Sequence, residues 1–123
     1  MPSDPSERAL FFRTVRNLKL LQKNDIVAGD FNCVPEVSQD TYSVGSPYAN
    51  KHGDVCESVM AEKNLTDVYR VFYGNQQNDY THFTGTVQTR LDRIYSKKHG
   101  ASARWVSYKH EHSFQDSSDH SAI

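Results

Sequence analysis

Hydrophobic residues recur with two periods along the chain, first the period of a helix and later that of strands. Near the N-terminus, Phe11, Val15 and Leu18 repeat at the spacing that places side chains on one face of a helix. Asp4 precedes this stripe and is a residue type that caps helix N-termini. The pattern therefore predicts a helix that begins after Asp4 and ends near Leu21.

A short apolar run follows, and a polar segment separates it from a second helix. The run at 25–28 stops at Gly29, which is typical of a strand buried on both faces of a sheet. Residues 33–53 are rich in proline, glycine and serine and predict a long loop, which in a compact domain is usually functional. Beyond it, Asp54 and Asn64 occupy the positions expected for the start and stop of a second helix.

The rest of the chain has the composition of strands. Residues that favour strands, β-branched or aromatic, gather at 68–73, 80–83, 90–95 and 103–108, with a turn expected at Gly85. The resulting order is helix, strand, helix and then several strands. This order predicts a mixed α/β (α+β) fold.

Length and composition limit the class of protein. With 123 residues, 37% hydrophobic and 11% aromatic, the chain has the size of one domain or a piece of one and too many aromatic residues for a disordered tail. No apolar run approaches the roughly 20 residues that cross a bilayer, and the N-terminus has no signal-peptide core. Two cysteines cannot form a disulfide framework. We therefore expect an intracellular protein, nuclear or cytoplasmic, without a membrane partner.

The net charge of -1 conceals an uneven distribution of charge. Residues 24–79 carry three basic and nine acidic side chains, whereas residues 80–110 carry six basic side chains and one acidic side chain. A chain divided in this way can hold a cation in one region and phosphate groups in another. Uneven surface charge without a ligand is the alternative explanation.

The most specific local string is Gly-Asp-Phe-Asn at 29–32, directly after the first expected strand. A carboxylate and a carboxamide two residues apart at a strand end can face one crevice. Asp30 can then accept a proton from an attacking water or help to hold a metal, and Asn32 can donate hydrogen bonds to a phosphate oxygen. The alternative is a turn in which both side chains bond only to nearby backbone.

A second candidate pair joins Asp92 to the Ser-Asp-His string that ends at His120. Strand alternation places Asp92 on the same face as Ile94. If that face is buried, the carboxylate needs a partner, and His120 would supply one. A carboxylate that holds an imidazole fixes its tautomer and raises its basicity. The alternative is an ordinary exposed histidine.

Other histidines and a cysteine offer weaker metal chemistry. His52 and Cys56 are four residues apart, and His110 and His112 would share one strand face. These spacings match no standard zinc pattern, so we do not expect a zinc site among these four residues.

Four strings in a fixed order resemble one superfamily. They are GDFN at 29–32, YTHF at 80–83, TRLDRIY at 89–95 and SDH at 118–120. The chain is similar in these strings to the endonuclease/exonuclease/phosphatase superfamily, which includes deoxyribonuclease I, abasic-site endonucleases and LINE-type retrotransposon endonucleases. The resemblance implies a four-layer α/β/β/α sandwich and a metal-dependent phosphodiesterase.

The resemblance also implies a role for each matching residue. Asp30 corresponds to the aspartate that orients or deprotonates the attacking water, and Asn32 to the asparagine that bonds the scissile phosphate. His120 corresponds to the histidine that contacts the phosphate in the transition state, and Asp92 to the aspartate that orients this histidine. Asp119 corresponds to the aspartate near the divalent metal, and Asp30 is the second expected metal ligand in the same comparison.

A cofactor and a substrate follow from the same resemblance. Mg²⁺, with Mn²⁺ as a substitute, would neutralise charge on the phosphate oxygens, and DNA is the expected substrate. Thr81, Phe83 and Arg90 stand where the family contacts the phosphate backbone and nucleotide. The D-V-Y-R run at 67–70 and the R-L-D-R-I-Y run at 90–95 most resemble LINE-type endonucleases, in whose elements a reverse transcriptase extends the nicked strand.

The chain also departs from the superfamily. His82 stands where the family usually has an aromatic residue, and Thr89 where it has serine. Nothing before Asp30 supplies the asparagine and the metal-binding glutamate of the family's first half. We therefore expect residues 1–123 to be the C-terminal portion of a single domain whose N-terminal half is missing. Two alternatives stay open: a non-catalytic retroelement remnant that at most binds nucleic acid weakly, and a phosphatase or sphingomyelinase-like esterase of the same fold.

Overall fold

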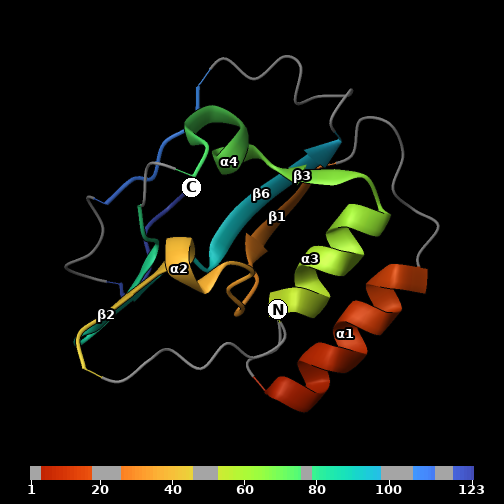
Figure 1. Ribbon diagram of the computed structural model, residues 1–123, viewed down its shortest axis with the longest axis horizontal. Helices are drawn as coiled ribbons and strands as arrows, with labels where there is room; N and C mark the ends of the chain where they lie inside the picture. The colour runs from red at the N-terminus through yellow and green to blue at the C-terminus, as the bar shows by residue number, and fades with distance from the viewer. Residues whose placement is uncertain (1–3, 18–25, 46–52, 76–78, 98–106, 113–117) are drawn as a thin grey trace.

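The computed structural model describes residues 4–17, 26–45, 53–75, 79–97, 107–112 and 118–123 (Figure 1). Its elements follow the chain as α1 (Pro5–Asn17), β1 (Ile26–Asp30), α2 (Val37–Asp40), β2 (Thr41–Ser43), α3 (Gly53–Glu62), β3 (Leu65–Asp67), α4 (Val68–Tyr73), β4 (His82–Thr84), β5 (Val87–Thr89) and β6 (Asp92–Lys97). This combination of helices and small sheets confirms the expected mixed α/β class.

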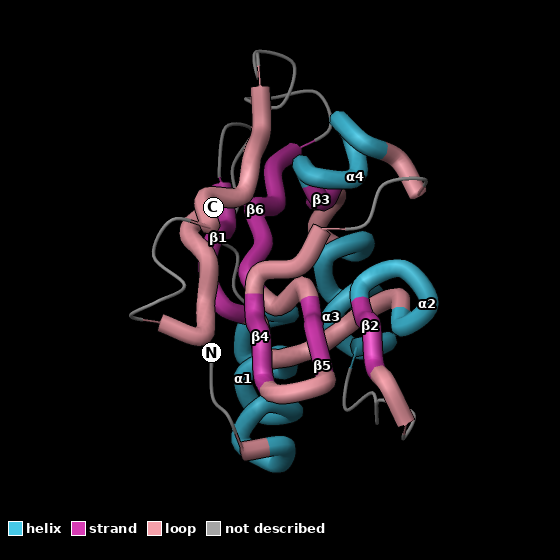
Figure 2. The backbone as a smooth tube through the Cα atoms, turned by 90° about the vertical axis from the view of Figure 1, so that its left-hand side faces the viewer, coloured by secondary structure: helices cyan, strands magenta, loops and turns pink. Residues whose placement is uncertain are grey.

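The strands form two antiparallel sheets of three strands each in the described part of the chain. One sheet has the order β1-β6-β3 and the other the order β2-β5-β4. Figure 2 shows β4, β5 and β2 side by side, with β6, β1 and β3 beyond them. In the first sheet, Asp30 at the end of β1 pairs directly with Asp92 at the start of β6. This register brings two candidate site residues to one end of the sheet.

The main hydrophobic core lies between helices α1 and α3 and one face of the first sheet. The two helices lie side by side in Figure 1. Helical residues such as Phe12 and Val59 pack with Leu65 and Tyr95 from the sheet, and all four are buried. Burial of one aliphatic or aromatic side chain contributes about 1.5–3 kcal/mol, so this layer fixes both helices on the sheet.

The opposite face of the first sheet has a smaller cluster. Ile94 on β6 packs there against Val68, Tyr69 and Tyr108. The outer strand β1 is less covered than expected, because Ile26 is 49% exposed. The expectation that this strand is buried on both faces is therefore wrong for the described residues, since none of them packs over Ile26 closely enough to bury it.

Local capping explains where the helices begin and end. The Asp4 carboxylate accepts hydrogen bonds from the backbone N–H groups of Ser6 and Glu7, which confirms it as the cap of α1. Helix α3 begins at Gly53, one residue before the predicted start, and Asn64 beyond its end has a φ of 55°. The predicted continuation of the first helix to Leu21 lies outside the described residues.

The expectation of a strand at 68–73 is wrong, because this segment is helix α4. The Asp67 carboxylate accepts a hydrogen bond from the Tyr69 N–H and so begins a helix at residues whose composition favours strands. Gly74 ends the helix with a φ of 60°, a conformation that glycine adopts without strain. The neighbouring strand is instead the three-residue β3.

Strand boundaries also differ in the second half of the chain. The turn at Gly85 joins β4 to β5, and β6 is a separate strand, so residues 80–95 hold three strands where two were expected. The predicted loop at 33–53 contains α2 and β2. Of the strand expected at 103–108, only Ser107 and Tyr108 are described, and neither lies in a strand.

A network of buried charges joins the two sheets. Asp40 at the end of α2 accepts hydrogen bonds from Arg90 at 2.8 Å and from Arg93 at 3.1 Å, and it also pairs with Arg70. Asp67 accepts further bonds from Arg90 at 2.6 Å and from Arg93 at 2.9 Å. Burial alone would raise the pKa of Asp40, but the guanidinium groups outweigh it and hold the pKa below its usual 3.8.

Among the described residues, no helix has the length and apolar character needed to cross a membrane.

Candidate active site

The Asp30–Asn32 turn forms one wall of the candidate site. Gly29 has a φ of 145° and Asn32 a φ of 47°, so the chain turns sharply at the end of β1. Asparagine tolerates this left-handed conformation better than most residues. The two oxygens of Asp30 accept hydrogen bonds from Asn32, one from its backbone N–H at 2.8 Å and one from its Nδ2 at 2.9 Å. Arg8 of α1 donates to the Asn32 carbonyl and ties the turn to that helix.

The Asp92–His120 pair lies beside this turn, because Asp92 is the cross-strand partner of Asp30. Asp92 Oδ2 lies 2.8 Å from His120 Nδ1, as strand alternation with Ile94 led us to expect. Because the carboxylate accepts a hydrogen bond from Nδ1, the imidazole is held with Nε2 directed away from Asp92. No other described residue bonds to this Nε2, and the His120 side chain is partly exposed. The imidazole can therefore reach a ligand.

Acidic neighbours favour the charged form of His120. Burial alone would lower the pKa of His120, but the hydrogen bond and charge of Asp92 outweigh it. The charges of Asp30 and Asp119 act in the same direction, and the pKa rises above its ordinary 6.5. Three carboxylates from separate segments thus surround one imidazole, and the resulting imidazolium would attract an anion such as a phosphate.

One protein family matches most of the chain. A sequence model of the Endonuclease/Exonuclease/phosphatase family matches residues 1–120. The chain belongs to this family. No curated protein matches the chain. The family comprises hydrolases of phosphate esters that generally use divalent metal ions.

Thr81 lies beneath the site. Its side chain is fully buried, and its hydroxyl accepts hydrogen bonds from the backbone N–H groups of Leu91 at 3.1 Å and Asp92 at 3.0 Å. Its carbonyl accepts a further bond from the Ser121 N–H, next to His120. Thr81 therefore fixes both partners of the Asp92–His120 pair.

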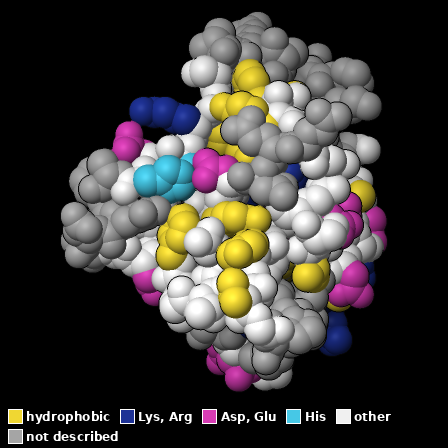
Figure 3. All heavy atoms as spheres, turned by 60° about the vertical axis from the view of Figure 1, so that its left-hand side comes forward, with side chains coloured by type: hydrophobic (Ala, Val, Ile, Leu, Met, Phe, Trp, Pro, Cys, Tyr) yellow, Lys and Arg dark blue, Asp and Glu magenta, His cyan; other side chains and the backbone are white. Residues whose placement is uncertain are grey.

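His82 and Asp119 form the exposed side of the site. The rings of His82 and His120 have centroids 4.7 Å apart, and His82 Nε2 lies 3.7 Å from Asp119 Oδ2. The Phe83 N–H donates to the Asp119 carbonyl and holds the Ser-Asp-His segment against β4. In the face that Figure 3 shows, histidine and acidic side chains lie together above a group of hydrophobic side chains. The sequence marked His82 only as a departure from the family. It did not predict that His82 lies beside His120.

Four of the residues predicted to be catalytic are in contact: Asp30 pairs with Asp92 across the strands, Asn32 bonds to Asp30, and Asp92 contacts His120. The fifth, Asp119, precedes His120, and its side chain lies near His82. It places the predicted substrate contacts differently, because Thr81 and Arg90 are buried while Phe83 is partly exposed. A contact of these three side chains with substrate stays a prediction.

The family's divalent metal finds suitable donors here. The carboxylates of Asp30 and Asp119 are oxygen ligands of the kind that Mg²⁺ prefers, and Asp119 is 65% exposed in its side chain. Mg²⁺ often uses one or two carboxylates and completes its shell with water and substrate phosphate. Among the described residues, the compact group of three potential metal ligands includes neither Asp30 nor Asp119. The donor chemistry of these two carboxylates therefore suits Mg²⁺.

Proposed function

We propose that the chain forms part of a Mg²⁺-dependent endonuclease domain that hydrolyses a phosphodiester bond of DNA. One observation carries the proposal: Asp92 holds His120 at 2.8 Å directly beside the Asp30–Asn32 turn, at the paired ends of β1 and β6. This arrangement puts an imidazole and the Asp30 carboxylate next to each other at one end of the sheet. The family match supports phosphate-ester hydrolysis in general, and the DNA substrate is our proposal.

His120 would bind the phosphate. With Nδ1 held by Asp92, the protonated ring donates a hydrogen bond from Nε2 to a phosphate oxygen. Its positive charge then stabilises the extra negative charge of the transition state, an effect that is strongest where the donor is already fixed in position. The Asp92 carboxylate stabilises the imidazolium and preserves its orientation.

Asp30 would act on the attacking water. The water oxygen forms a new bond to phosphorus as Asp30 accepts its proton, and the bond from phosphorus to the leaving oxygen breaks. Asn32 holds the carboxylate and presents its amide toward the phosphate. Mg²⁺, held by Asp30 and Asp119, would neutralise charge on the phosphate oxygens.

The charge distribution and the local strings favour DNA and a LINE-type enzyme. Residues 80–110 carry six basic side chains and one acidic side chain. Arg90 and Arg93 are buried and paired with Asp40 and Asp67, so a polyanion would meet only the remaining basic side chains of this segment. The runs at 67–70 and 90–95 provide the LINE-type resemblance, and they support a nick that a reverse transcriptase extends. Hydrolysis of inositol phosphates or sphingomyelin in place of DNA would instead favour the esterase alternative.

We further propose that residues 1–123 are the C-terminal portion of the complete domain. Asp4 already caps α1 and is therefore committed to the helix, which leaves few carboxylates before Asp30 for a metal. The exposure of Ile26 on β1 is consistent with a further layer over this strand.

We also propose that the protein is intracellular, either nuclear or cytoplasmic.

Nicking of supercoiled plasmid DNA tests the function. We expect Mg²⁺-dependent nicking, by this chain or by a longer protein that contains it, that falls at least about 100-fold in Asp30→Asn and in His120→Gln. Asp54→Asn, an exposed carboxylate on α3, is the matched control and should retain activity. Full activity in His120→Gln, or no nicking by either form of the protein, would overturn the proposal and favour the non-catalytic remnant.

A further inference from the structure

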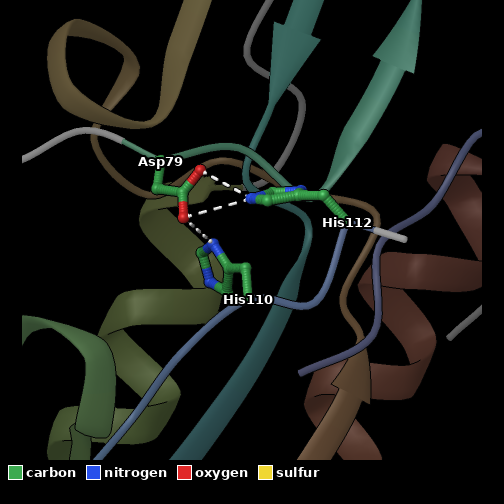
Figure 4. Close-up of side chains that lie close together, drawn as sticks. All are labelled: Asp79, His110 and His112. Carbon is green, nitrogen blue, oxygen red and sulfur yellow. Dashed lines mark hydrogen bonds and ion pairs between the residues drawn. The ribbon is translucent and has the colours of Figure 1, made fainter. Parts of the chain in front are cut away.

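A second cluster of polar side chains lies beside the candidate active site. Figure 4 shows Asp79 facing His110 and His112, which come from a segment about thirty residues further along the chain. Asp79 Oδ2 lies 2.9 Å from His110 Nδ1, and Asp79 Oδ1 lies 3.2 Å from His112 Nε2. All three ligand atoms lie within 4.8 Å of one another. Sequence reasoning joined the two histidines but had no pattern that would add Asp79.

His110 is the unusual member of this cluster. Its side chain is 0% exposed, and its ring stacks on Tyr69 at a centroid distance of 5.0 Å. Although Nδ1 is close to Asp79, the contact lacks the angles of a hydrogen bond, and Nε2 has no partner among the described residues. A buried imidazole without a proper hydrogen bond is costly, and a metal ion bound between the ring and the carboxylate would give Nδ1 a partner.

His112 is already oriented as a ligand. Its Nδ1 lies 2.7 Å from the Ser121 hydroxyl, so its Nε2 faces Asp79. Metal-binding histidines usually have their second ring nitrogen held in this way by a polar group, which fixes the tautomer and the ring orientation. The Ser121 hydroxyl would thus orient His112 as a metal ligand without binding the metal itself.

We propose that Asp79, His110 and His112 bind a Zn²⁺ ion. Ligand atoms around tetrahedral Zn²⁺ lie about 3.3 Å apart, given bonds of about 2.0–2.1 Å. One carboxylate oxygen, Asp79 Oδ2, lies 2.9 Å from His110 Nδ1 and 3.4 Å from His112 Nε2, close to this separation. The three ligand atoms lie within 4.8 Å of one another, so the rings would need only a small approach to share an ion. Three protein ligands leave a fourth position for water or another small ligand.

The donor set selects the class of metal. Two imidazole nitrogens and one carboxylate favour borderline ions such as Zn²⁺ over Mg²⁺, which prefers oxygen ligands. The site is therefore chemically distinct from the carboxylates of Asp30 and Asp119. It does not depend on the proposed endonuclease activity.

The bound ion would connect three segments of the chain. Asp79 lies two residues before Thr81, and His112 contacts Ser121, the neighbour of His120. Backbone pairing of Glu111 with Ala122 brings the same segments together. Zn²⁺ would thus stabilise the position of the Ser-Asp-His segment without touching the substrate.

Direct metal binding tests the proposal. Titration of the metal-free chain with Zn²⁺, followed by calorimetry, should give one site per chain, and Co²⁺ should give the visible absorption of a tetrahedral ion. Mg²⁺ in excess should not displace either ion. Asp79→Asn and His112→Gln should each weaken Zn²⁺ binding at least about tenfold.

A matched variant separates this site from adventitious binding. Glu111→Gln removes a carboxylate between the two histidines that is not part of the cluster, and it should bind Zn²⁺ like the parent chain. Far-UV circular dichroism of each variant shows that loss of binding is not loss of folding. Absence of Zn²⁺ binding in the parent chain, or unchanged binding in both ligand variants, would refute the site and leave an Asp–His contact without a metal.

Discussion

The buried hydroxyl of Thr81 accepts a hydrogen bond from the backbone N–H of Asp92 at 3.0 Å, and another from the preceding residue. The side chain of Asp92 in turn holds His120. A threonine that no solvent reaches thus determines where the first residue of β6 lies. Its importance for the site comes through Asp92, so we treat it as a positioning residue.

Replacement of Thr81 by valine should destabilise the protein by about 1–3 kcal/mol, because two buried backbone N–H groups lose their acceptor. Urea unfolding followed by circular dichroism measures this change. Thr81→Ser keeps the hydroxyl and should recover most of the loss. Equal destabilisation by valine and serine would show that the methyl group, rather than the hydroxyl, matters.

His120 should titrate above its ordinary pKa of 6.5 in the folded protein, and Asp92→Asn should lower its pKa. NMR of the imidazole protons across this pH range measures both values. Because the pKa is raised on folding, the contribution of His120 to stability is complete below pH 6.5 and is lost as the pH rises through the folded pKa. A pKa for His120 that does not respond to Asp92→Asn would contradict the pairing.

Asp40→Asn should destabilise the protein by about 3–5 kcal/mol, because it leaves the buried guanidinium groups of Arg90 and Arg93 with too little negative charge. The midpoint of urea unfolding at neutral pH measures this. Glu62→Gln, which removes an exposed pair with Arg16, is the control and should cost less than about 1 kcal/mol. A similar effect of both substitutions would show that burial does not strengthen the network.

Local patterns predicted the parts of the fold that depend on local interactions. The Asp4 cap and helix α1 followed from capping and spacing, and β1 followed from its apolar run. The prediction of a strand at 68–73 is wrong, because the composition of this segment favours strands while the Asp67 cap selects a helix. Composition favoured a strand there, whereas the hydrogen bond that Asp67 accepts from the Tyr69 N–H favours the helix that forms.

The candidate site was predictable only in part. Strand alternation on β6 placed Asp92 beside Ile94 and suggested a partner such as His120, and the structure has this contact. The burial of Arg90 depends on Asp40, fifty residues away, and no local pattern specifies that pairing. The same holds for Asp79 and His110, since their contact arises only when distant segments pack together.

The distances along the chain have a consequence for folding. His120 and Asp92 are 28 residues apart, and the strand that carries Asp30 pairs with β6 from a still more distant part of the sequence. Contacts with such large sequence separation require the ordering of long intervening loops, which slows their formation. The helix α1 can form early from its own residues, whereas the site assembles in the same late step that pairs β1 with β6. Appearance of the native NMR signal of the His120 imidazole during refolding would therefore report completion of the whole sheet rather than a local event.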